Sequence, residues 1–184
     1  FTPYDNLYLL PAGHSLLIDK NLCSSTPFKW WNLAENPIDD SDESIDSEFN
    51  RLMDEACEIR LRSDVPIASA LSGGLDSSSI FAKVNQAETK VSRFCPGNYR
   101  TCFNMSFNTS LDSEHEFAEL VATYLQQECK FAFINADNLW SDLSLLTNHF
   151  GDFSGTPLTC ISPLYNYISN NGIKVSIDGH GGDE

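Results

Sequence analysis

The chain has 184 residues, 41% of them hydrophobic, which is typical of one medium-sized globular α/β domain or of one domain with an added arm. Its formal net charge is −15 and it holds only 11 lysines and arginines. We therefore expect no nucleic-acid partner, because binding to phosphates needs clustered basic side chains. No stretch reaches the roughly 18 apolar residues of a membrane span, and the opening residues lack the basic start of a signal peptide. We expect a cytoplasmic protein with no membrane partner.

The cysteines and the Asn-x-Ser triplets of this chain are weak evidence for secretion. The six cysteines form no Cys-x-x-Cys pair, and several lie in apolar or helical patterns, where a free thiol behaves as a small hydrophobic group. We expect reduced thiols, with a bridge from Cys95 to Cys102 as the main exception. Asn104 and Asn108 each begin an Asn-x-Ser triplet in or beside a predicted strand, and we take both triplets as chance.

Short strands are predicted near the N-terminus. Residues 6–19 alternate apolar and polar side chains around Pro11 and Gly13, a pattern that favours two short strands and a turn. An aromatic stretch at residues 27–33 follows as a connector. The acidic stretch at residues 35–49 is typical of a solvated linker that leads into a helix.

A helix is predicted over residues 43–62. Its apolar side chains recur at helical spacing, and they are Ile45, Phe49, Leu52, Met53, Ala56 and Ile59. Arg60 and Arg62 fall in the last turn, where basic side chains interact favourably with the helix dipole.

Strands and helices alternate along the rest of the chain. The apolar runs predict strands at residues 65–71, 101–107, 130–136 and 173–178. Helices are predicted at residues 76–86, 113–127, 137–149 and 162–170. This alternation predicts an α/β fold with a doubly wound, mainly parallel sheet and a short N-terminal β arm. Ligands of such sheets bind beyond the carboxyl ends of the strands.

The first glycine-rich motif, SGGLDSS at residues 72–78, lies between a predicted strand and a predicted helix. Gly73 and Gly74 allow close approach of the backbone to a ligand. Backbone N–H groups at the helix N-terminus can form an anion cradle with the hydroxyls of Ser72, Ser77 and Ser78. Asp76 would repel a phosphate, so its presence indicates a Mg²⁺ ion between the two.

A purely structural interpretation of this motif is a glycine turn followed by a helix that Ser72 or Asp76 caps. It does not explain why so many positions carry groups that bind anions. The motif is neither a Walker A loop nor the dinucleotide-binding G-x-G-x-x-G turn. We favour a phosphate site.

The second motif, IDGHGGDE at residues 177–184, follows the last predicted strand. It offers the titratable side chains of Asp178, His180, Asp183 and Glu184. Taken alone it is weak, because glycine-rich turns with acids are common at strand ends.

Together the two motifs resemble the synthetase domain of asparagine synthetases and their relatives, the PP-loop or N-type ATP pyrophosphatase group. The likeness is carried by RLRSDVPIASALSGGLDSSSI at residues 60–80 and GIKVSIDGHGGDE at residues 172–184. It implies an adenine nucleotide alpha-hydrolase-like fold, with residues 1–40 as a linker arm that follows a missing glutaminase domain. Residues 41–184 would form a synthetase domain that continues beyond Glu184, where the family carries a catalytic lysine.

The resemblance also implies an activity of the glutamine-hydrolysing asparagine synthase type. Such enzymes cleave ATP between the α and β phosphates, adenylate a carboxylate such as aspartate, release pyrophosphate and pass the acyl group to ammonia or an amine. The resemblance assigns the pyrophosphate to Ser72, Gly73, Gly74, Ser77 and Ser78. It assigns Mg²⁺ to Asp76 and Asp183, and adenine to Leu71 and Met105 with backbone near Asp178 and Gly179. We expect residues 1–184 alone to bind nucleotide weakly and to catalyse nothing.

His180 departs from the family pattern, because asparagine synthetases usually carry Glu and β-lactam synthetases Tyr at this position. An imidazole could accept the proton of an attacking amine, or it could merely cap the loop. The departure leaves a second reading open, a lasso-peptide or β-lactam type of cyclising synthetase, which in the lasso case acts on a peptide. A non-catalytic nucleotide-binding paralogue is a third reading, against which the intact Asp76 and Asp183 argue.

Overall fold

The computed structural model describes residues 2, 4–21, 26–32, 42–87, 100–107, 114–134, 139–150 and 158–181. The chain divides into two compact units, Phe1–Ile45 and Asp46–Glu184, each of which is described by itself. Among the helices of the described residues, none has the length and apolar character to cross a membrane.

The first unit holds a small antiparallel pair, β1 (His14–Ser15) with β2 (Phe28–Lys29). The prediction of two strands within residues 6–19 is wrong, because the partner of β1 comes from the stretch expected to be a connector. Gly13 has a φ of +68°, and its carbonyl accepts hydrogen bonds from the backbone of Trp30 (2.9 Å) and Trp31 (3.2 Å). These bonds hold the aromatic segment against the turn.

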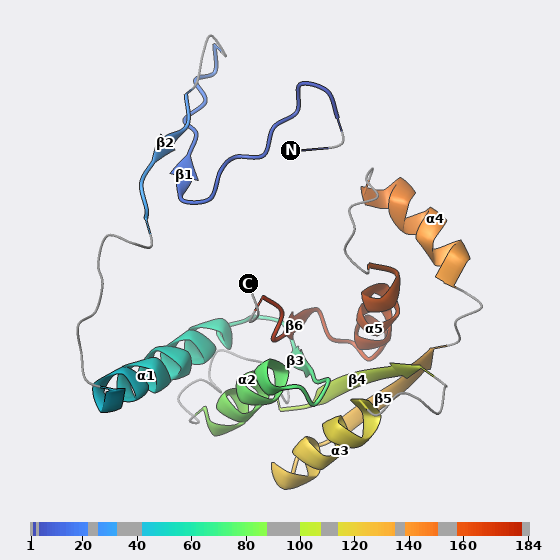
Figure 1. Ribbon diagram of the computed structural model, residues 1–184. Helices are drawn as coiled ribbons and strands as arrows, with labels where there is room; N and C mark the ends of the chain where they lie inside the picture. Colours follow the sequence, from blue (N-terminus) through green and yellow to red (C-terminus); the bar gives the residue numbers. More distant parts are fainter. Residues whose placement is uncertain are drawn as a thin grey trace. The chain divides into compact units, whose positions relative to one another are not determined.

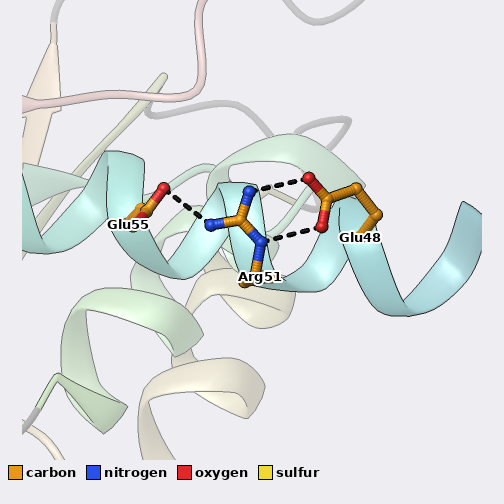
Figure 2. Close-up of polar contacts among 3 residues, drawn as sticks. All are labelled: Glu48, Arg51 and Glu55. Atoms are coloured by element: carbon orange, nitrogen blue, oxygen red, sulfur yellow. Dashed lines mark hydrogen bonds and ion pairs between the residues drawn. The ribbon is translucent and has the colours of Figure 1, made fainter.

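Helix α1 (Asp42–Arg60) is confirmed, but only part of the predicted apolar stripe is covered, with Met53 and Ala56 half-buried. Among its described residues Cys57 is buried, whereas Phe49 (62% exposed) and Ile59 (56%) lie open. Figure 2 shows Arg51 between Glu48 (2.7 Å) and Glu55 (3.0 Å), two exposed ion pairs at i,i+3 and i,i+4 spacing that water screens and that contribute little to stability.

The rest of the second unit alternates strands and helices, as predicted. Its elements are β3 (Ile67–Ala70), α2 (Leu75–Gln86), β4 (Cys102–Phe107), α3 (Glu114–Tyr124), β5 (Cys129–Ile134), α4 (Leu139–Phe150), α5 (Leu158–Asn170) and β6 (Val175–Ile177). The strands form one parallel sheet in the order β5-β4-β3-β6. The α/β fold with a parallel sheet is therefore confirmed.

Helices cover both faces of this sheet, as in a doubly wound fold. Ile67 and Leu71 point to one face, where they pack with residues of α1, α2 and α3. Ala68 points to the other face and packs with Phe103 and Ile168 of α5. Figure 1 shows α2 and α3 on one side of the strands and α5 on the other.

Helix α5 begins earlier than predicted. The sequence pattern predicted a helix near residues 162–170. The helix instead starts at Leu158 and contains Pro163 in its interior. Its C-terminal part carries the residues that contact the sheet.

The thiols of Cys57, Cys102 and Cys129 are free. Cys102 is thus not bridged, so the exception foreseen for it does not occur. The pKa of Cys102 is raised by the neighbouring Cys129 thiol and by burial, which keeps Cys102 protonated. The side chains of the other three cysteines lie outside the described residues.

Candidate functional site

A cavity of about 510 Å³ opens at the carboxyl ends of β3 and β6, beside Phe103, Asn104 and Met105 of β4. The chain leaves β3 toward β4 and β5 and then returns to place β6 on the other side of β3. This is the topological switch point of the sheet, where open α/β folds bind ligands. Its walls include Ala70, Leu71, Ser72, Gly74, Leu75, Asp76, Ser77, Phe103, Asn104, Met105, Glu114, Ile161, Leu164, Asp178, Gly179 and His180.

The loop between β3 and α2 can follow its path only because residue 73 is glycine. Gly73 has a φ of +85°, and a Cβ there would come within 2.4 Å of the Phe117 Cβ and 2.7 Å of the Ala118 nitrogen. The loop therefore lies directly on the first turns of α3, and no side chain fits between them.

The hydroxyls of the first motif bond to one another and to the loop. Ser72 Oγ and Ser77 Oγ are 2.9 Å apart, and Ser72 Oγ also accepts from the Gly74 N–H at 3.2 Å. The N-cap of α2 is Gly74, and it makes no side-chain capping bond. The alternative of a helix capped by Ser72 or Asp76 is thus not the arrangement found. The N–H groups of the first turn point toward the cavity end of the helix axis, as an anion cradle requires.

Gly179 brings the second motif against the first. A Cβ at Gly179 would lie 2.6 Å from the Ser77 nitrogen and 2.8 Å from the Asp76 carbonyl carbon. Both are backbone atoms of the first turn of α2, which cannot move aside. The chain therefore passes the helix N-terminus too closely for any side chain at residue 179, and residues of both motifs line one cavity.

Asp178 joins three elements through its carboxylate. Oδ1 accepts from the backbone N–H of Ala70 at 3.2 Å and from the Ser176 hydroxyl, and Oδ2 accepts from the Tyr165 hydroxyl at 2.5 Å. Burial raises the pKa of Tyr165, and the hydrogen bond to Asp178 raises it further. The Asp178 carboxylate is thus committed to holding β3, β6 and α5 together.

Most of the predicted site residues lie in this cavity. Its walls include Leu71, Ser72, Gly74, Asp76, Ser77, Met105, Asp178, Gly179 and His180. Gly73 and Ser78 are not among the lining residues. Ser78 Oγ is buried and has no hydrogen-bond partner among the residues the structure describes. Asp183 lies outside the described residues, so its predicted place stays a prediction.

Sequence reasoning missed three contributors, Asn104, Tyr165 and Ser176. The Asn104 amide donates to the Leu71 carbonyl at 2.8 Å and so holds the start of the loop. Its signal was a polar side chain within an apolar strand, which we read as a chance glycosylation triplet. Tyr165 and Ser176 offered no comparable signal, because nothing in the sequence pairs either of them with Asp178.

The lining of the cavity is of two chemical kinds. Phe103, Met105, Ile161 and Leu164 contribute apolar surface, whereas the serine hydroxyls and Asp76 contribute polar groups. Within the described part of the chain, no hydrogen bond or ion pair engages the Asp76 carboxylate, which leaves it available to a cation. No group of three metal-ligating side chains occurs among the described residues, so a metal ion here would take further ligands from elsewhere.

A ligand with both an anionic and a flat apolar part fits this mixed lining. The helix N-terminus and the hydroxyls of Ser72 and Ser77, which line the cavity, suit phosphate oxygens. The apolar surface suits a heterocyclic base. The donor set therefore fits a nucleotide, with Asp76 as one ligand of an accompanying divalent cation.

Comparison with known proteins settles the family. A family model described as asparagine synthase matches residues 48–184. The chain belongs to the asparagine synthase family. The predicted resemblance to asparagine synthetases is thereby confirmed, and the match includes both motifs of the cavity.

Individual relatives extend over longer chains. The putative glutamine-hydrolyzing asparagine synthetase 2 of Methanocaldococcus jannaschii is 30% identical over 189 residues, which cover all of this chain and 34% of that protein. Amidase chry2 of Gibberella zeae is 27% identical and matches all of this chain and 29% of that protein. The chain thus spans about a third of the length of these relatives of the asparagine synthase family. A solved structure of NH3-dependent NAD synthetase from Campylobacter jejuni shares 17% identity and a TM-score of 0.43, over 70% of this chain and 54% of that chain.

We predict that Gly179→Ala separates the two motifs of the cavity. The added Cβ would meet backbone atoms of Ser77 and Asp76, so the segment must shift, at a cost of about 1–3 kcal/mol of unfolding free energy. Amide hydrogen exchange at Ser77 and Ala70 should become faster. Gly172→Ala is the comparison, because a Cβ there meets no atom within 4 Å. Its φ of +82° adds backbone strain of its own, but that strain arises at residue 172, outside the contact between Gly179 and Ser77. Equal protection of Ser77 and Ala70 in both variants would contradict the close contact.

A second prediction concerns Tyr165 and high pH. The folded state holds the Tyr165 proton more tightly than the unfolded chain, so the bond to Asp178 contributes fully below the ordinary tyrosine pKa of about 10. Its contribution should be lost as the pH rises above that value. We expect the free energy of unfolding of the wild type to exceed that of Tyr165→Phe by about 1 kcal/mol at pH 8. This difference should shrink between about pH 10 and 11.5. Urea unfolding at each pH measures it, and a constant difference would refute the prediction.

Proposed function

We propose that this chain carries the ATP site of an AMP-forming amide ligase of the asparagine synthetase type. In the first step a carboxylate oxygen of the substrate, aspartate or an analogue, attacks the α-phosphorus of ATP, the bond to the β-phosphate breaks, and pyrophosphate leaves. In the second step an amine or ammonia attacks the activated acyl carbon, and AMP leaves. One observation carries this proposal: Gly179 joins the serine motif and the His180 motif in a single cavity.

The chain's own residues divide the nucleotide between the polar and the apolar lining of the cavity. We infer that Ser72, Gly73, Gly74, Ser77 and Ser78, with the first N–H groups of α2, bind the pyrophosphate portion. The support is the loop geometry at Gly73 and the helix N-terminus, which attracts negative charge. The base lies against Leu71 and Met105, next to the backbone of Asp178 and Gly179.

We infer that Asp76 and Asp183 hold a Mg²⁺ ion. When bound, this ion offsets the charge on the leaving pyrophosphate. Support comes from Asp76, whose carboxylate is engaged by no other described side chain and lines the cavity beside the serine hydroxyls. Asp178 is a poorer ligand, because its two oxygens already accept three hydrogen bonds.

We propose that the imidazole of His180 is the base that accepts the proton of the attacking amine. The side chain lies at the cavity and is exposed, so a second substrate can reach the imidazole. An imidazole ring nitrogen can accept a proton from an amine, which the serine hydroxyls and apolar side chains of this cavity cannot do.

The acceptor and the domain context belong to the whole protein. We propose residues 1–40 as a linker arm, residues 41–184 as part of a synthetase domain, and a glutaminase domain in the same chain that supplies ammonia. The names of relatives that specify glutamine hydrolysis support this proposal. We also propose a cytoplasmic location. Two of the relatives are named amidases and not asparagine synthetases. Experiments on the acceptor should therefore test a broad range of amines.

Pyrophosphate release tests the proposed function. The full-length protein is incubated with ATP and Mg²⁺ and with pairs drawn from a panel of carboxylates and amines, including aspartate, glutamine, ammonia and peptides with a free terminus. We expect pyrophosphate and AMP in equal amounts, dependent on one carboxylate. Release of phosphate and ADP instead, or no turnover with any pair, would overturn the ligase proposal, and nucleotide binding without turnover would indicate a binding module.

A separate prediction tests His180. His180→Ala and His180→Gln should both lose amide formation by about 100-fold or more, because neither side chain can accept the amine proton. Both variants should bind ATP and Mg²⁺ within about threefold of wild type, since the phosphate cradle is unchanged. Isothermal titration and product analysis measure the two effects. His180→Gln keeps hydrogen-bonding groups, so full turnover in that variant would show that the residue is not the base.

A further inference from the structure

The Asn104 amide occupies a place where a strand ladder ends. β3 and β4 pair in parallel through Ser69–Cys102 and Ala70–Phe103, and the Leu71 N–H still donates to the Phe103 carbonyl at 2.8 Å. The Leu71 carbonyl then accepts from the Asn104 side chain at 2.8 Å. Beyond this point β4 continues beside β5 as far as Phe107, while the chain after Leu71 turns into the loop.

The orientation of this amide is fixed by its partners. A carbonyl oxygen can only accept a hydrogen bond, so the NH₂ group of Asn104 must face Leu71. The Asn104 oxygen accepts from the Ser106 hydroxyl at 2.9 Å on the other side. Both side chains are 2% exposed, so water does not compete for these bonds.

Leu71 is the last anchored residue before the serine loop. Its side chain is buried and packs with Phe81 and Ala118, and its N–H and C=O are both held by β4. Ser72, whose hydroxyl bonds to Ser77 and Gly74, comes next. The direction of the Leu71 carbonyl therefore sets the direction in which the loop enters the cavity.

We propose that Asn104 is a positioning residue for the phosphate loop. It fixes the Leu71 carbonyl and, through it, the place of Ser72 relative to the N-terminus of α2. Asn104 is also one of the residues that line the cavity. This inference rests on the proposed function, because it assigns Asn104 a part in binding ATP.

Asn104→Asp tests the proposal with almost no change in shape. The carboxylate cannot donate to the Leu71 carbonyl, so we expect the KM for ATP to rise by about tenfold, with kcat changed less than about threefold. Ser106→Ala is the matched control. It removes the neighbouring hydroxyl and leaves the bond to Leu71, and its KM for ATP should stay within about threefold of wild type. Pyrophosphate release by the full-length protein measures both constants.

The split between KM and kcat separates positioning from a general loss of structure. A destabilised variant has fewer active molecules, which lowers kcat and leaves KM unchanged. If Asn104→Asp does not fold, Asn104→Ser replaces the amide by a shorter donor, and its KM for ATP is expected to lie above those of wild type and Ser106→Ala. An unchanged KM for ATP in a folded Asn104→Asp, or equal effects of Asn104→Asp and Ser106→Ala, would overturn the proposal.

Failure of the proposed function would be visible separately. In that case the wild-type protein itself releases no pyrophosphate with any substrate pair. Titration of ATP with Mg²⁺ into the wild type, Asn104→Asp and Ser106→Ala then decides the role of Asn104. A weaker dissociation constant in Asn104→Asp alone supports it, and equal constants in all three proteins refute it.

Discussion

The close approach of Gly179 to the first turn of α2 is the constraint on which the cavity depends. A helix is ordinarily separated from a neighbouring loop by side chains, but here a Cβ at Gly179 would lie 2.6 Å from the Ser77 nitrogen. The contact joins segments about a hundred residues apart, at the point where the sheet order reverses. Because Gly73 makes an equally close contact with α3, the serine loop is held between two backbones. The cavity is therefore shaped by main-chain atoms, which move less than side chains do.

Two side chains complete what the backbones cannot. Asp178 accepts from Ala70 of β3, from Ser176 of β6 and from Tyr165 of α5, and Asn104 of β4 holds the Leu71 carbonyl. The side chains of Asp178 and Asn104 each replace a backbone hydrogen bond that the sheet would otherwise supply, at the point where two strands stop pairing. A buried polar group without its partner is costly, so these bonds can form only in one register. The ends of the strands are thereby fixed while the cavity between them stays open.

The sequence predicted the alternation of strands and helices well, because apolar runs and helical periodicity are local properties. It also placed the two glycine motifs after strands, and the parallel sheet then brings them together. The burial of α1 was harder, because periodicity predicts a helix and not the face that packs: Cys57 is buried and Phe49 is not. The partner of β1 and the hydrogen bonds of Asp178 were beyond prediction for one reason. They join distant residues, and a single sequence holds no signal for such pairs.

Saturation of Asp178 changes the electrostatics of the whole cavity. Three donors surround that carboxylate, so much of its negative charge is already balanced by hydrogen bonds. Asp76 has no such balance among the described residues and lies beside the serine hydroxyls that suit phosphate. Under the proposed function, a triphosphate alone would meet an uncompensated carboxylate and be repelled. A divalent cation removes this repulsion, so binding of nucleotide and binding of cation must strengthen each other, and each affinity rises by the same factor in the presence of the other ligand.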